Sequence, residues 1–142
     1  RQGALSRLLG PTGLELIQAL HREPAKIFAN RLWGDLGYIH LCFDIRGMAE
    51  MRKHCAEQGF PFTVDSNPET ADGRPGTFRM GEAAGSFAYV EDPDGTLIEF
   101  VETHRIPVVK KLGLTIDLSK RAPEQPLPDL LLKALNWTAK AD

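Results

Sequence analysis

The chain has few of the features that mark exported or membrane-bound proteins. It has only two cysteines among 142 residues, Cys42 and Cys55, which have neither zinc-site spacing nor the density of a disulfide scaffold. Its apolar runs, such as 130–132, are far too short to span a bilayer, and the N-terminus shows no charged head followed by an apolar signal core. We therefore expect a cytoplasmic protein with reduced thiols and no membrane partner.

The chain also has no large excess of positive or negative charge. The formal net charge is -2, and the lysines and arginines are scattered along the chain. Proteins that bind nucleic acid need a basic patch or stripe, so no nucleic-acid partner is expected. A hydrophobic content of 42% with 25% charged residues is typical of one globular domain whose partners are small molecules or protein.

The middle of the chain has clear periodicity. Residues 38–45 alternate between apolar and polar side chains as a strand does, and residues 47–58 carry apolar side chains at helical spacing, followed by Gly59 as a C-terminal cap. The tetrapeptide Asp92-Pro93-Asp94-Gly95 has the composition of a hairpin turn. The predicted elements are a strand at 38–45, a helix at 47–58, short strands at 60–64 and 77–80 around a polar loop at 65–76, and strands at 86–91 and 96–103.

The two ends differ from this pattern. A hairpin is predicted at the start, with strands at 3–9 and 14–20 around the turn Gly10-Pro11-Thr12-Gly13. Residues 21–36 have no clean period and are interpreted as a linker. The tail is predicted to form a strand at 112–118, a proline-rich stretch at 121–128 and a helix at about 129–139, which needs burial against the domain or a second subunit.

Three polar residues interrupt apolar strands. His40 points to the face opposite Leu41, Glu99 lies between two apolar neighbours, and Glu15 repeats that arrangement in the first hairpin. A charged group taken out of water needs a partner or a metal ion, so these three residues are candidate ligands. The alternative interpretation is that each is an ordinary polar residue on a solvent-exposed face.

Three sequence motifs resemble the vicinal oxygen chelate superfamily of glyoxalases, bleomycin resistance proteins and extradiol dioxygenases. Residues 37–45 read G-Y-I-H-L-C-F-D-I, similar to the opening strand of a module in which the histidine of G-x-x-H-x-x-x-x-V binds metal. Residues 91–100 read E-D-P-D-G-T-L-I-E-F, similar to the last hairpin, D-P-D-G-x-x-I-E-L, whose glutamate is a ligand. Residues 10–16, G-P-T-G-L-E-L, resemble the same hairpin of a preceding module.

The resemblance implies an α+β fold in which two βαβββ modules pair into a cup-shaped eight-stranded mixed sheet. It divides the chain into the end of a truncated first module at 1–20, a linker at 21–36, a complete second module at 37–104, and a C-terminal extension at 105–142. It implies metal ligands at His40, Glu99 and Glu15. A fourth ligand is then expected before Arg1 or from another chain, so the sequence is expected to be a fragment or to act as a homodimer.

The activity that the resemblance implies is that of a metal-dependent lyase or isomerase. The substrate would be a small α-oxygenated carbonyl compound or thioester, and a divalent ion (Zn, Ni, Co, Mn or Fe(II)) would stabilise its enolate. Glu99 would be both ligand and proton carrier. Candidate substrate contacts are Cys42, which could instead be a small apolar filler, and Arg74 and Arg79, which could instead be solvated.

Two other functions stay open. An extradiol-type dioxygenase would use the same fold with an Fe(II) site of two histidines and one glutamate. A metal-free binding protein of the antibiotic-resistance type would use the fold only to enclose a small molecule, and such relatives usually lack the histidine and glutamate ligands.

Overall fold

Within the described residues, one strand and one helix are followed by five strands and a final helix. The computed structural model describes residues 13–26, 29–66, 78–80, 83–109, 113–122 and 125–138. The elements are β1 (His40–Asp44), α2 (Met48–Glu57), β2 (Val64–Asp65), β3 (Phe78–Met80), β4 (Ala83–Glu91), β5 (Leu97–Val109), β6 (Leu114–Asp117) and α3 (Asp129–Thr138). None of the described helices has the length and apolarity to cross a membrane.

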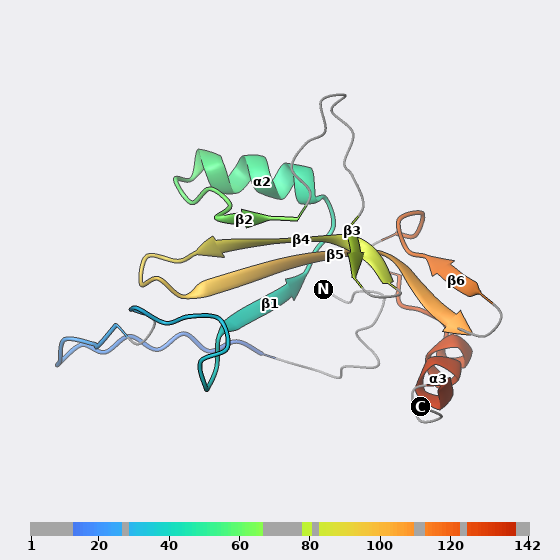
Figure 1. The fold of residues 1–142 in the computed structure, drawn as a ribbon, viewed down its shortest axis with the longest axis horizontal. Helices are drawn as coiled ribbons and strands as arrows, with labels where there is room; N and C mark the ends of the chain where they lie inside the picture. The colour runs from blue at the N-terminus through green and yellow to red at the C-terminus, as the bar shows by residue number, and fades with distance from the viewer. Residues whose placement is uncertain are drawn as a thin grey trace.

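All the strands among the described residues belong to one mixed sheet. Its order is β1-β5-β4-β2, with β3 also paired to β4 and β6 to β5. β1 runs parallel to β5, and the other pairs are antiparallel. Figure 1 shows α2 over one side of β4 and β5, while β6 and α3 lie at the far end of β5. The α+β class and the mixed sheet are thus confirmed.

The turn between β4 and β5 follows from its sequence. The carboxylate of Asp92 accepts hydrogen bonds from the backbone N–H groups of Asp94, at 2.9 Å, and Thr96, at 2.8 Å. Gly95 has φ of 85°, a left-handed conformation in which a side chain would be strained. This turn fixes the antiparallel register that places Tyr89 opposite Glu99.

Helix α2 is tied to the sheet at its first turn. Gly47 precedes the helix with φ of 84° and provides no side chain to cap it. Instead, the Glu102 carboxylate on β5 accepts hydrogen bonds from the N–H groups of Gly47, at 3.0 Å, and Met48, at 3.1 Å. These are two of the donors that a helix N-terminus leaves without a partner inside the helix. A side chain from the sheet therefore caps the helix and holds it on that face.

The apolar interior has two parts. Under α2, the buried apolar residues include Met48, Ala88 and Val90. At the other end, Leu118, Leu127 and Leu132 form a cluster against which Ile106, Ile116 and Leu131 also pack. Helix α3 therefore packs on the extended part of β5 and on β6 rather than projecting alone.

Several boundaries differ from the sequence predictions. The strand expected at 14–20 is wrong, because residues 13–20 have no strand and the side chains of Leu16 and Ile17 are 88% and 84% exposed. The strand expected at 60–64 is reduced to Val64–Asp65, and β5 continues beyond 103 to Val109. The partner strand at 3–9 and the turn at 10–12 lie outside the described residues. The described strands form one six-stranded sheet, and the division into two modules and the eight-stranded cup remain predictions.

Candidate functional site

The sheet brings His40 and Glu99 together on the face opposite α2. β1 and β5 are parallel neighbours, with His40 in register with Leu97 and Cys42 with Glu99. The His40 Nε2 atom lies 3.0 Å from the Glu99 Oε2 atom, and the two side chains are 22% and 16% exposed. The structure thus brings these two side chains together, and their role as metal ligands stays a prediction.

Tyr89 on β4 completes the arrangement around the carboxylate. It lies opposite Glu99 in the antiparallel register, and its hydroxyl donates a hydrogen bond of 2.8 Å to Glu99 Oε1. Burial and the neighbouring Glu99 carboxylate raise the pKa of Tyr89 above its usual value, so the phenol keeps its proton. Both oxygens of Glu99 are thus oriented, one by His40 and the other by Tyr89.

Trp33 covers this pair from the segment before β1. Its ring centroid is 6.2 Å from that of His40 and 5.4 Å from that of Tyr89, while His40 and Tyr89 are 5.4 Å apart. Arg31 holds the segment by donating to the carbonyl groups of Tyr38, at 3.1 Å, and Leu36, at 2.7 Å. The linker predicted at 21–36 therefore contributes an aromatic wall to the site.

Cys42 lies beside Glu99 as the strand register requires. The residue is exposed, yet desolvation of its thiol and the adjacent Glu99 carboxylate raise the pKa of Cys42 to about 12. A thiol with so high a pKa stays protonated near neutral pH and is a weak nucleophile. Its chemistry here is that of a neutral hydrogen-bond donor to Glu99.

The pair offers two ligands of the kinds that borderline divalent ions accept. An imidazole nitrogen and a carboxylate oxygen suit zinc, nickel, cobalt, manganese and iron(II). The carboxylate is already oriented by Tyr89, as ligating carboxylates commonly are, whereas the buried His40 Nδ1 atom has no hydrogen-bond partner in the part of the chain described. No group of three or more His, Cys, Asp or Glu side chains is gathered for a metal among the described residues. The residues thus fit half of a metal site.

Among the described residues, Glu15 is not brought to this pair. Glu15 lies in the exposed segment that forms no strand, so the geometry that would have aligned it is absent there. Arg74 lies outside the described residues, and for Arg79 only the backbone, in β3, is described. Their proposed roles stay predictions.

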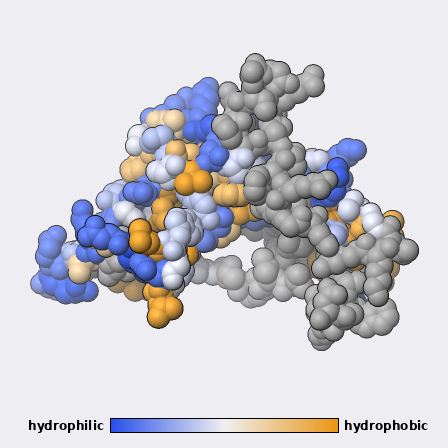
Figure 2. All heavy atoms as spheres, viewed as in Figure 1, coloured by the Kyte–Doolittle hydropathy of each residue, from blue (hydrophilic) through white to orange (hydrophobic). Residues whose placement is uncertain are grey.

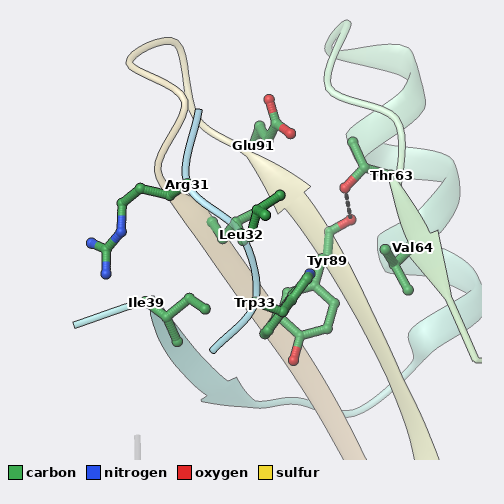
Figure 3. Close-up of a pocket in the computed structure, with 9 residues that line it drawn as sticks. Arg31, Leu32, Trp33, Ile39, Thr63, Val64, Tyr89 and Glu91 are labelled. Atoms are coloured by element: carbon green, nitrogen blue, oxygen red, sulfur yellow. Dashed lines mark hydrogen bonds between the residues drawn. The ribbon is translucent and has the colours of Figure 1, made fainter. Parts of the chain in front are cut away.

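A pocket adjoins the pair on the same face. Its volume is about 290 Å³, and its walls include Trp33, Tyr89, Ile39 and Leu97. Figure 3 shows the Trp33 and Tyr89 rings next to one another, with Ile39 nearby. Sequence reasoning missed both aromatic residues. Alternation along β4 could have found Tyr89, but no periodic signal surrounds Trp33.

Comparison with known proteins gives a partial structural likeness. No family model and no curated protein matches the chain. Among solved structures, a glyoxalase family protein from Enterococcus faecalis is 22% identical with a TM-score of 0.38, over 57% of this chain and 52% of that one. An integron cassette protein from V. cholerae is 25% identical with a TM-score of 0.33, over 58% and 56%. Lactoylglutathione lyase from Agrobacterium tumefaciens is 21% identical with a TM-score of 0.30, over 57% and 52%.

In each case the matched region spans little more than half of the solved chain. The description of the mixed sheet rests on the chain's own strand order and on the parallel pairing of β1 with β5.

Proposed function

We propose that His40 and Glu99 bind a divalent metal ion in a glyoxalase-like lyase or isomerase. The single observation that carries the proposal is the contact of 3.0 Å between His40 Nε2 and Glu99 Oε2, made by two strands that the parallel register aligns. The substrate class is a small α-oxygenated carbonyl compound or thioester. The remaining ligands would come from segments outside the described residues or from a second copy in a homodimer.

Glu99 is the residue placed to move a proton. A bound divalent ion would supply Lewis-acid stabilisation of the negative charge that develops on the substrate oxygens. Glu99 would accept the proton from the carbon next to the carbonyl group and return it, which requires a carboxylate fixed within reach of that carbon. Tyr89 is a positioning residue, because its hydrogen bond of 2.8 Å restricts rotation of the carboxylate.

The exposure of the pair is suited to this chemistry. His40 and Glu99 keep 22% and 16% of their side-chain surface accessible, so a ligand can reach them. The rings of Trp33 and Tyr89 lie near the His40 ring and reduce the access of bulk water to it. Electrostatic interactions are stronger in such a partly dry site than in water.

The first experiment is metal analysis of the purified protein after incubation with Zn²⁺, Ni²⁺, Co²⁺ or Mn²⁺. We expect one metal ion per site in the wild-type protein and loss of metal in His40→Ala and Glu99→Ala. The matched controls are His54→Ala and Glu57→Ala, which remove the same residue types from exposed positions of α2. Circular dichroism checks that each variant is folded. Wild-type protein that binds no metal, or variants that keep it, would refute the proposal.

Activity is tested separately by exchange of carbon-bound protons. Nuclear magnetic resonance in D₂O would follow hydroxyacetone in the presence of metal-loaded protein. We expect exchange in the wild type and its loss in Glu99→Gln, because the amide cannot accept the proton. Full exchange by Glu99→Gln would exclude Glu99 as the proton carrier.

A metal-free binding protein is the second candidate. The observation that favours it is the pocket walled by Trp33 and Tyr89, since aromatic side chains bind small molecules without any metal. Under this alternative, ligand binding would survive in His40→Ala and Glu99→Ala, and no metal would be bound.

A further inference from the structure

The pocket beside His40 and Glu99 has a chemistry of its own. Tyr89 belongs both to the pocket wall and to the pair, since its ring lines the pocket and its hydroxyl donates to Glu99. Leu97 also lines the pocket and is in register with His40 across the strands. A ligand bound to the pair can therefore extend one group into the pocket without leaving this face of the sheet.

The walls of the pocket are mainly apolar and aromatic. The apolar and aromatic side chains that line it are Leu32, Trp33, Ile39, Val64, Tyr89 and Leu97. Trp33 and Tyr89 meet edge to face, with their planes at 74°. Such a corner presents one ring face and one ring edge, the two surfaces against which a third planar ring packs well.

Two polar side chains of the lining, Arg31 and Thr63, already donate hydrogen bonds within the chain. Arg31, the one cation among the described lining residues, donates to the carbonyl groups of Leu36 and Tyr38, and Figure 3 shows it directed away from Trp33 and Tyr89. Thr63 donates to the carbonyl oxygen of Tyr89 at 3.3 Å. Glu91 would repel an anion. A phosphate or carboxylate in this pocket would thus be repelled by the Glu91 carboxylate. The Arg31 guanidinium, which could attract it, already donates to backbone carbonyl groups.

We propose that the pocket binds an uncharged aromatic ring carried by the substrate. This inference rests on the proposed function and narrows its substrate to an aryl-substituted α-oxygenated carbonyl compound. The volume of about 290 Å³ is just below the range of roughly 300–1,000 Å³ for small-molecule sites, so it suits a single ring. The ring would stack in the corner of Trp33 and Tyr89 while the oxygenated carbon reaches Glu99.

Calorimetric titration of three probes into metal-free protein tests this inference. The probes are 2-hydroxyacetophenone, hydroxyacetone, which lacks the ring, and dihydroxyacetone phosphate, which carries an anion. We expect 2-hydroxyacetophenone to bind at least about tenfold more tightly than either of the others, since burying and stacking one ring contributes at least that factor. Equal affinities, or tighter binding of the phosphate, would overturn the proposal.

Substitutions in the segment before β1 test where the aromatic ring binds. Trp33→Ala is expected to remove the preference for the ring, whereas Trp33→Phe should keep most of it. The Trp33 side chain is 61% exposed, so its loss is tolerable for the fold. The matched control is Leu36→Ala, because Leu36 belongs to the same segment, is 97% exposed and does not line the pocket. A preference for the ring that persists in Trp33→Ala would refute the assignment.

The titration also separates this inference from the metal-dependent function. Binding of the ring is measured without metal, so it stands or falls on the pocket alone. Failure of the proposed function would appear instead as absence of metal in the wild-type protein, while the ring preference and its loss in Trp33→Ala would be unchanged.

Discussion

The contact between Glu102 and helix α2 gives a prediction whose size can be worked out. The Glu102 carboxylate accepts the N–H groups of Gly47 and Met48, and its side chain is only 15% exposed. Loss of an N-terminal cap costs ~0.5–2 kcal/mol, and loss of a charge at the positive end of a helix costs ~0.3–1 kcal/mol. Glu102→Gln keeps one acceptor oxygen, so we expect the free energy of unfolding to fall by about 1–2 kcal/mol.

Urea denaturation at pH 7 measures this change. With a slope typical of small domains, the midpoint should fall by roughly 0.5–1 M urea without a change in slope. The control is Glu57→Gln, whose carboxylate is exposed and lies 3.8 Å from Lys53 Nζ. Exposed pairs of this kind contribute only a few tenths of a kcal/mol, so the control should resemble the wild type.

The pH dependence of the free energy of unfolding also tests the contact between Glu102 and α2, because the direction of the change can be worked out. Burial alone would raise the pKa of Glu102, but hydrogen bonds from Gly47 and Met48 and the nearby His104 lower it below its usual value of 4.5. The carboxylate therefore stabilises the fold above that value, and the contribution is lost as the pH falls through the folded-state pKa. The difference between wild type and Glu102→Gln should shrink on acidification. A difference that is absent at pH 7, or the same at pH 3, would refute the reasoning.

Three further predictions address the site and the packing around it. Tyr89→Phe keeps the ring but removes the donor to Glu99, so we expect metal binding to remain while proton exchange slows by about tenfold; unchanged exchange would argue against positioning by Tyr89. Arg52→Ala breaks a contact of 2.6 Å with Asp65 that ties α2 to β2, and thermal unfolding should show a loss of about 1 kcal/mol, whereas Arg52→Lys should lose less. Leu127→Ala opens a cavity at a fully buried position, and urea denaturation should show a loss of ~2–5 kcal/mol; a loss below ~1 kcal/mol would contradict its place in the core.

The site strands were predictable because alternation fixes which face a side chain takes. The sequence pattern placed His40 and Glu99 on the faces opposite their apolar neighbours, and the structure places them on one face. The distance of 3.0 Å between His40 Nε2 and Glu99 Oε2 could not be predicted from this pattern, since it depends on the parallel pairing of two strands far apart in the chain. The motif resemblance provided that long-range information, which local periodicity does not contain.

The sequence predictions that were wrong or incomplete have physical causes. Leu14–Leu20 has strand-like composition, but an extended segment is stabilised only when another strand satisfies its backbone groups, and within the described residues none is paired with it. β5 was expected to end before Pro107, yet it continues because β6 pairs with it and a register shift accommodates that position. Trp33 was missed because the hydrogen bonds of Arg31, rather than any periodicity, set its position.

The segment before β1 exposes apolar side chains, and the sequence pattern alone did not explain why. Figure 2 shows apolar side chains exposed over this segment, and Leu32, Trp33 and Leu36 are among the exposed apolar residues. A linker is expected to be polar, since its side chains face water. Here part of its apolar surface lines the pocket, which accounts for Leu32 and Trp33 but not for Leu36.

Strand β5 serves both faces of the sheet at once. Glu99 points to the candidate site, whereas Glu102, three residues further on, points to the opposite face and holds α2. A shift of one residue in the pairing of β5 would reverse both side chains together, exposing the helix end and emptying the site in the same event. An insertion or deletion between Asp92 and Gly95 that shifts this register would therefore alter folding and the candidate site jointly.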